Sequence, residues 1–151
     1  MEKHQRGSSF ATRAVHAGQG YDPKTGAHAT PIYQTSTFIL GTLERGSALF
    51  AGEEKGNIYS RIGNPTVRAV EEKIASLEGA EAGVAFSSGM GAVAGVLLGL
   101  LKSGDEVLIL GPLYGGTRGM METLLPRFGI TTRAVPDAEL ESAIGPNTAM
   151  I

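Results

Sequence analysis

Cysteine is absent from the 151 residues of this chain. Disulfide bonds, thiolate metal sites and a cysteine nucleophile are therefore excluded, and the composition fits a reducing compartment. The histidines, His4, His16 and His28, do not have the spacing of metal ligands. The sequence therefore gives no reason to expect a metal site.

Long apolar runs and a strong charge imbalance are missing too. The longest apolar run, residues 92–101, is about half of the roughly 20 residues that a membrane-spanning helix needs. The first twenty residues are polar and contain no apolar signal-peptide core. The net charge is −2 and the basic residues are scattered, so no nucleic-acid footprint or basic membrane patch is visible. We expect a cytoplasmic protein that binds neither nucleic acid nor membranes.

Glycine, by contrast, is abundant: the chain has 22 glycines without a collagen-like period. Glycines spread in this way mark tight turns and places where backbone approaches a ligand closely.

The order of the predicted elements indicates an α/β protein with a mostly parallel sheet. Residues 1–62 show little periodicity and predict an extended arm with one short helix. The rest predicts an α/β domain, with helices at 64–78, 89–101, 117–125 and 137–144 and strands at 83–87, 106–110, 130–135 and 148–151. This alternation is typical of βαβ units, whose helices cover both faces of the sheet. Because the chain ends within a predicted strand, we expect only the first part of that domain here, with the fold continuing beyond it.

The clearest helix signals surround residues 64–78. Asn64 is a good N-cap, Pro65 suits the first helical position, and Gly79 suits a left-handed C-cap. Apolar residues recur on one face of this helix, at Val67, Val70, Ile74 and Leu77.

The strongest chemical signal is SSGMGA at residues 87–92, between a predicted strand and a predicted helix. The N-terminus of a helix offers unpaired N–H groups and partial positive charge, which favour an anion such as phosphate. Glycines allow the backbone to close on the anion, and Ser87 and Ser88 add hydroxyl donors. A tight turn whose serines only cap the helix is an equally good interpretation of this segment.

A dinucleotide site is a weaker interpretation of the same loop. Gly89, Gly91 and Ala94 match G-x-G-x-x-A, but that pattern also needs an acidic residue at the end of the next strand, about 20 residues on. Residues 108–117 contain no acidic residue, so we reject this interpretation.

Two further segments carry candidate ligand-binding side chains. Arg61 has a guanidinium that suits a phosphate, and Tyr59 could share that load. Tyr114 follows the strand predicted at 106–110, and ligands of open parallel sheets bind beyond such strand ends. Its ring could stack on a flat ligand and its hydroxyl could move a proton. In isolation, the simpler interpretations are favoured: a solvated arginine beside a surface tyrosine for Arg61 and Tyr59, and an aromatic side chain that covers the end of the sheet for Tyr114.

Taken together, the motifs resemble the Cys/Met-metabolism family of pyridoxal-phosphate enzymes, which includes methionine γ-lyase, cystathionine γ-lyase, cystathionine γ-synthase and the O-acylhomoserine sulfhydrylases. The matching segments follow one another through most of the chain: ATRAVHAGQ (11–19), TPIYQTSTF (30–38), YSRIGNPT (59–66), LEGAEAGVAFSSGMGA (77–92), GDEVL (104–108) and LYGGT (113–117). The resemblance implies the N-terminal part of an aspartate-aminotransferase-like fold (fold type I), left incomplete, with pyridoxal 5′-phosphate as the cofactor.

The resemblance also implies roles for individual residues. Ser88, Gly89 and Met90 would bind the cofactor phosphate, the last two through backbone N–H groups. Tyr59 and Arg61 would bind the phosphate of a neighbouring subunit's cofactor, since the family's arm crosses a subunit interface. Tyr114 would stack on the pyridine ring and assist proton transfer at the leaving group.

The implied reaction is γ-elimination or γ-replacement on a sulfur amino acid or a homoserine derivative, with the cofactor as electron sink. Much of the arm and residues 50–66 look like methionine γ-lyase, which favours a lyase acting on methionine or a related sulfur amino acid. The resemblance also implies that the complete enzyme is a homotetramer built as a dimer of dimers. The Tyr-Gly-Gly-Thr form at 114–117 is commoner in the γ-synthase, sulfhydrylase and cystathionine γ-lyase branches. The family's Ser-x-Thr-Lys lysine and pyridinium-binding aspartate have no match in these residues. We therefore expect the chain alone to be inactive. Alternatively, it is a non-catalytic remnant that binds phosphate or pairs with a full-length subunit.

Overall fold

A computed structural model describes residues 8–151 of the chain, so His4 lies outside the described part. The chain forms two compact units, Met1–Ala85 and Phe86–Ile151. The predicted boundary between arm and α/β domain, after residue 62, stays a prediction.

The first unit contains three helices within its described residues: α1 (Phe10–His16), α2 (Leu43–Ala51) and α3 (Pro65–Glu78). The prediction of a single helix in the arm is therefore wrong. Both arm helices have local capping signals: the Ser9 hydroxyl accepts from the Thr12 N–H at 3.2 Å, and Thr42 caps α2 in the same way at 3.2 Å. Both helices are short, with 7 and 9 residues, and apolar periodicity is a reliable signal only over windows of about 11 residues or more.

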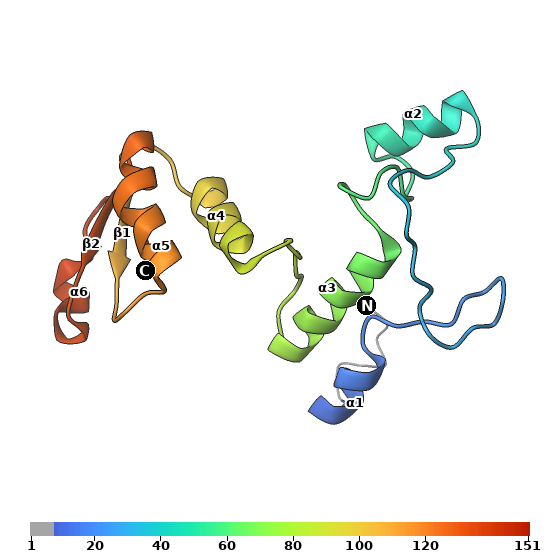
Figure 1. The fold of residues 1–151 in the computed structure, drawn as a ribbon, viewed down its shortest axis with the longest axis horizontal. Helices are drawn as coiled ribbons and strands as arrows, with labels where there is room; N and C mark the ends of the chain where they lie inside the picture. Colours follow the sequence, from blue (N-terminus) through green and yellow to red (C-terminus); the bar gives the residue numbers. More distant parts are fainter. Residues whose placement is uncertain (1–7) are drawn as a thin grey trace. The chain divides into compact units, whose positions relative to one another are not determined.

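Helix α3 begins and ends as predicted. The Asn64 side chain accepts from the Thr66 N–H at 2.9 Å, and Gly79 ends the helix in the left-handed region at φ 70°. Helix α1 lies alongside α3 (Figure 1), where the Arg13 guanidinium donates to the Ser76 carbonyl at 2.9 Å. The arm is thus anchored to the C-terminal half of α3.

The predicted apolar face of α3 is only partly covered by the described residues of its unit. Val70 and Ile74 are 53% and 52% exposed, while the neighbouring Ala75 and Ser76 are buried. The face has the predicted periodicity, but within the described part of this unit it is only partly covered: Leu77 is half-buried, and Val67, Val70 and Ile74 stay exposed.

The strand predicted at residues 83–87 is not formed, and this prediction is wrong for the chain described here. A strand needs a partner, and no described strand pairs with this segment. The Ala85 N–H instead donates to the Glu71 carboxylate at 2.8 Å, and Val84 is 74% exposed.

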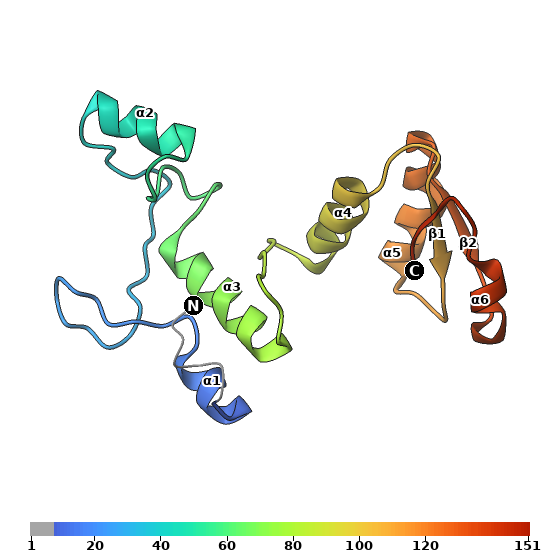
Figure 2. The ribbon, with the colours of Figure 1, turned by 180° about the vertical axis from the view of Figure 1, so that it is seen from behind.

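The second unit is a small α/β structure. Helix α4 (Gly89–Leu100) precedes β1 (Glu106–Ile109), and β2 (Thr131–Ala134) and β3 (Thr148–Met150) follow later in the chain. The strands are parallel in the order β2-β1-β3, so the predicted parallel arrangement is confirmed for these strands. Figure 2 shows the helical segment that begins at α5 (Gly115–Gly119) beside β1. The buried core consists of Leu97, Val107, Met121, Leu125 and Ile130.

The helix predicted at 117–125 is longer than expected. Helix α5 continues as a π turn, η2 (Met120–Leu124), and a 3₁₀ turn, η3 (Leu125–Phe128). Pro126 does not end the helix, because it lies in the first turn of η3, where a missing N–H costs nothing. Gly129, at φ 72°, ends it instead. The helix predicted at 137–144 is likewise a 3₁₀ turn, η4 (Asp137–Glu139), followed by α6 (Leu140–Ala143).

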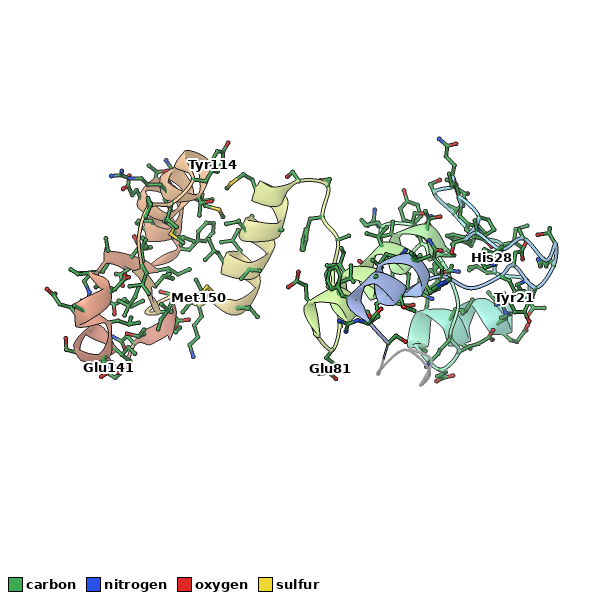
Figure 3. The ribbon with its side chains drawn as sticks, turned by 90° about the horizontal axis from the view of Figure 1, so that it is seen from below. Tyr21, His28, Glu81, Tyr114, Glu141 and Met150 are labelled. Carbon is green, nitrogen blue, oxygen red and sulfur yellow. The ribbon has the colours of Figure 1, made fainter. Side chains whose placement is uncertain are left out.

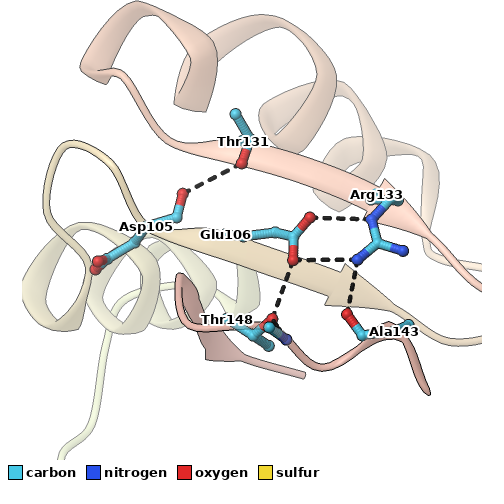
Figure 4. Close-up of polar contacts among 7 residues, drawn as sticks. Asp105, Glu106, Thr131, Arg133, Ala143 and Thr148 are labelled. Carbon is cyan, nitrogen blue, oxygen red and sulfur yellow. Dashed lines mark hydrogen bonds and ion pairs between the residues drawn. The ribbon is translucent and has the colours of Figure 1, made fainter. Parts of the chain in front are cut away.

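A polar network crosses the sheet edge to edge (Figure 4). Arg133 on β2 forms an ion pair with Glu106 on β1 at 3.0 Å and donates to the Ala143 carbonyl at 2.8 Å. Glu106 also accepts from the Thr148 hydroxyl on β3 at 3.0 Å. The bonds from Arg133 and Thr148 lower the pKa of Glu106 below its usual value of 4.5. One carboxylate therefore links all the strands of this sheet.

Candidate functional site

The N-terminus of α4 has the geometry of an anion site. Ser88 is extended, at φ −158° and ψ 158°, and its hydroxyl oxygen accepts from the Gly91 N–H at 3.0 Å. The N–H groups of Gly89 and Met90, which precede it, have no acceptor inside the helix; Gly89 is exposed and Met90 is half-buried. Capping uses an acceptor lone pair of Ser88, so its hydroxyl proton remains available to a ligand. The serine thus caps the helix, and the capped end still offers N–H donors to an anion.

Tyr114 lies beside this helix end in the same unit. It follows β1 and directly precedes α5, its side chain is 74% exposed, and Figure 3 shows it pointing outward. A Cβ on Gly116 would lie 2.8 Å from Cε1 of Tyr114 and 3.2 Å from the Met90 sulfur. The Thr117 hydroxyl donates to that sulfur at 3.7 Å. The structure therefore brings the predicted residues Met90 and Tyr114 together around Gly116.

The positive charge next to this loop is already paired. Arg118 forms an ion pair with Glu122 at 2.7 Å, and this contact raises the pKa of the guanidinium. Attraction of an anion to the α4 end therefore depends on backbone N–H groups and the helix dipole more than on Arg118.

Tyr59 and Arg61 lie in the first unit, in a loop fixed by backbone pairing. Tyr59 forms an antiparallel bridge with Thr37, and the Ser60 N–H donates to the Ser36 carbonyl at 2.8 Å. The Arg61 guanidinium carbon lies 4.8 Å from the centre of the Tyr59 ring, a cation–π contact that holds the two candidate side chains together.

Asn64 has a second role that sequence reasoning missed. Besides capping α3, its amide donates to the Tyr33 carbonyl and to the Ser60 hydroxyl, each at 2.9 Å. The Thr66 hydroxyl accepts from the Tyr33 N–H at 2.9 Å and donates to the Pro31 carbonyl at 3.1 Å. Two motifs distant in the sequence, at 30–38 and 59–66, are thereby one structural feature. The polar side chains of Asn64 and Thr66 were the only local signal in the sequence for these bonds.

Comparison with known proteins decides the family. The sequence pattern of the family described as "Cys/Met metabolism PLP-dependent enzyme" matches residues 11–151. The chain belongs to this family. It is 49% identical to an L-methionine gamma-lyase of Pseudomonas putida over 147 residues, which are 94% of this chain and 36% of that enzyme. It is 41% identical to an O-succinylhomoserine sulfhydrylase of Pseudomonas aeruginosa over 153 residues, 99% of this chain and 38% of that enzyme.

Solved structures show the same fold. A candidate O-acetylhomoserine (thiol)-lyase of Campylobacter jejuni, solved with N′-pyridoxyl-lysine-5′-monophosphate, superposes with a TM-score of 0.84 at 35% identity. The match covers 93% of this chain and 35% of that one. The fold is therefore the N-terminal part of fold type I, as the motifs predicted, and the chain spans little more than a third of the relatives it matches.

The residues present fit the family's cofactor, pyridoxal 5′-phosphate. The α4 end supplies N–H donors for a phosphate, and Tyr114 supplies a ring for stacking on a flat heterocycle. The space beside Gly89 is open to a ligand, because a Cβ there would meet no atom within 4 Å. Among the described residues, no group of acidic and histidine side chains could hold a metal ion. No helix within residues 8–151 is long and apolar enough to cross a membrane.

Proposed function

We propose that this chain forms the N-terminal part of a pyridoxal-phosphate-dependent carbon–sulfur lyase of the cytoplasm that acts on methionine or a related sulfur amino acid. The observation that carries the proposal is the meeting of the phosphate-type helix end and the Tyr114 loop at Met90 and Gly116. Identity of 49% to an L-methionine gamma-lyase supports the choice of substrate class.

Each site residue then has a defined task. The N–H groups of Gly89 and Met90 and the Ser88 hydroxyl bind the phosphate group. Tyr114 stacks on the ring and moves a proton at the leaving group. When bound, pyridoxal 5′-phosphate supplies the electron sink for eliminating a γ-substituent.

Tyr59 and Arg61 bind the phosphate of a neighbouring subunit's cofactor in a dimer of dimers. The 151 residues contain no Ser-x-Thr-Lys motif, so they do not catalyse alone.

The phosphate site is tested with pyridoxamine 5′-phosphate, which cannot react with lysines. Gly89→Pro removes one N–H donor where proline is tolerated, and Ser88 already has the extended backbone that precedes proline. Gly89→Ala keeps that N–H and is the matched control. Because a hydrogen bond to a charged group contributes about 1.5–3 kcal/mol, we expect Gly89→Pro to weaken binding about tenfold or more. Titration calorimetry measures this, with pyridoxamine as the phosphate-free control. Equal affinity for the two amines would contradict the proposal.

A γ-replacement enzyme is the second candidate, favoured by the 41% identity to an O-succinylhomoserine sulfhydrylase and by Gly115-Gly116-Thr117 after Tyr114. The complete gene product, reading on through any Ser-x-Thr-Lys motif, decides between them. Release of a thiol from methionine supports the lyase, whereas consumption of sulfide with an O-acylhomoserine supports replacement. If the frame stops after Ile151, co-purification with a full-length relative tests the role of a non-catalytic remnant.

A further inference from the structure

The Phe86 ring lies on a face of α4 that has no side chains. A Cβ built on Gly95 would lie 2.6 Å from Cζ and 2.8 Å from Cε1 of that ring. A Cβ on Gly91, one turn earlier, would lie 3.6 Å from Cβ of Phe86. Real Cβ atoms do not approach other atoms to 2.6 Å, so a side chain at position 95 would force the Phe86 ring to move from where it lies.

Backbone conformation does not account for this glycine. Neither Gly91 nor Gly95 has a positive φ, and a glycine inside a helix costs about 1 kcal/mol relative to alanine. Gly99 continues the same face, yet a Cβ there would meet nothing within 4 Å. Gly95 and Gly99 thus lie on the same face of α4, but only Gly95 is in contact with Phe86.

The contact lies next to the turn that leads into the helix. Only Ser87 and Ser88 separate Phe86 from the first residue of α4, and Ser88 caps the helix through the Gly91 N–H at 3.0 Å. A Cβ on Gly91 would lie 3.2 Å from the Ser88 oxygen. Phe86 and Ser88 thus both lie against Gly91, so the position of the ring constrains the direction of the cap and of the N–H groups after it.

We propose that Phe86, seated on Gly91 and Gly95, is a positioning residue that holds Ser88 and the Gly89 and Met90 N–H groups in place for the phosphate group. The proposal rests on the proposed function, because it assigns a support to the same phosphate site. Phe86 is 48% exposed, so the ring contributes here through this one-sided contact rather than by filling a buried core.

The experiment compares Gly95→Ala with Gly99→Ala, alone and in a Phe86→Ala background, in the full chain. Affinity for pyridoxamine 5′-phosphate is measured by calorimetry, and stability by urea unfolding followed by circular dichroism. Gly99→Ala should leave the affinity unchanged and stabilise the helix. Gly95→Ala should weaken binding about tenfold, within the range of coupling for residues in contact.

The Phe86→Ala background removes the obstacle, so adding Gly95→Ala to it should change the affinity no further. This non-additivity separates positioning from a general loss of structure. Equal affinities for wild type and Gly95→Ala would overturn the proposal while leaving the phosphate site intact. If Gly95→Ala does not fold, Phe86→Leu and Phe86→Ala decide alone, and unchanged affinity in both would overturn it. No binding by the wild-type chain would instead overturn the proposed function, and the role of Phe86 with it.

Discussion

At the residue scale, Gly18 lies where the arm packs against α3, and it shows how closely two backbones can approach. Gly18 has φ +69°, a conformation that side chains rarely adopt. A Cβ at this position would lie 2.1 Å from the Ala69 carbonyl oxygen, a backbone atom that cannot rotate away. Gly20, two residues on, has open space around it.

We predict that Gly18→Ala releases the arm from α3, whereas Gly20→Ala does not. Overpacking combined with a strained φ should destabilise the docked arm by about 1–3 kcal/mol. Hydrogen exchange measures this at the Ala17 N–H, which bonds the Arg13 carbonyl at 2.9 Å. Unchanged protection of that amide in Gly18→Ala would show that the close approach is not needed for docking.

At the scale of elements, Asn64 combines two functions that substitution can separate. Its oxygen caps α3, while its amide nitrogen holds the loop around Tyr33 and Ser60. Asn64→Asp keeps the capping oxygen and loses the donor, whereas Asn64→Ala loses both.

We therefore predict that Asn64→Asp leaves α3 intact but loosens the Tyr59–Arg61 loop. Loss of the cap in Asn64→Ala should in addition destabilise α3 by about 1 kcal/mol. Circular dichroism in urea reports on the helix, and exchange of the Ser60 N–H, bonded to Ser36 at 2.8 Å, reports on the loop. Identical loop exchange in wild type and Asn64→Asp would contradict this division of roles.

Because of the Glu106 network on the sheet, the free energy of unfolding of the second unit should depend on pH in the acidic range. Contacts with Arg133 and Thr148 lower the pKa of Glu106 below 4.5, so the unfolded state binds more protons in this range. The contribution to stability is complete above the unfolded pKa and is lost as the pH falls through the folded one.

We predict that the free energy of unfolding falls on acidification below about pH 4.5, and that Glu106→Gln reduces this fall. Glu141→Gln, which changes an exposed carboxylate on α6, serves as the control. Urea unfolding across an acidic pH series provides the measurement. If the free energy of unfolding falls equally with pH in wild type and Glu106→Gln, the Glu106 network is not the cause of the acid dependence.

Elements specified by neighbouring residues could be predicted from the sequence, and those specified by distant partners could not. Asn64, Pro65 and Gly79 determine α3 through contacts within a few residues, so its ends were predictable. A strand at 83–87 depends on a partner strand, which the described residues do not provide.

In the candidate site, too, features set by neighbouring residues were predictable and features set by distant residues were not. The phosphate-type turn follows from the chemistry of a helix end, which the sequence at 87–92 contains by itself. The contact of Thr117 with Met90 joins residues 27 positions apart. The contact of the Phe86 ring with Gly95 depends on how the chain before α4 folds back on that helix. Only coordinates can show such contacts.

At the scale of the whole molecule, each unit exposes apolar surface that a complete domain would bury. Val70 and Ile74 are exposed in the first unit, and Leu98 and Leu100 in the second. The chain spans 36–39% of its methionine gamma-lyase relatives from the two Pseudomonas species. Residues that cover such faces in a finished fold would therefore come from the other part of an enzyme of that length.

We predict that the isolated 151-residue chain self-associates and binds the dye ANS, because exposed apolar faces and open strand edges favour contacts between molecules. Replacing Val70 and Ile74 with serine should reduce both effects, since it removes apolar area from α3 without touching the caps. Glu72→Ser, an exposed change on the same helix, should leave both unchanged. Analytical ultracentrifugation over a concentration series measures the association. A monomer with a sharp, concentration-independent melt would mean that the two units bury enough apolar surface by themselves.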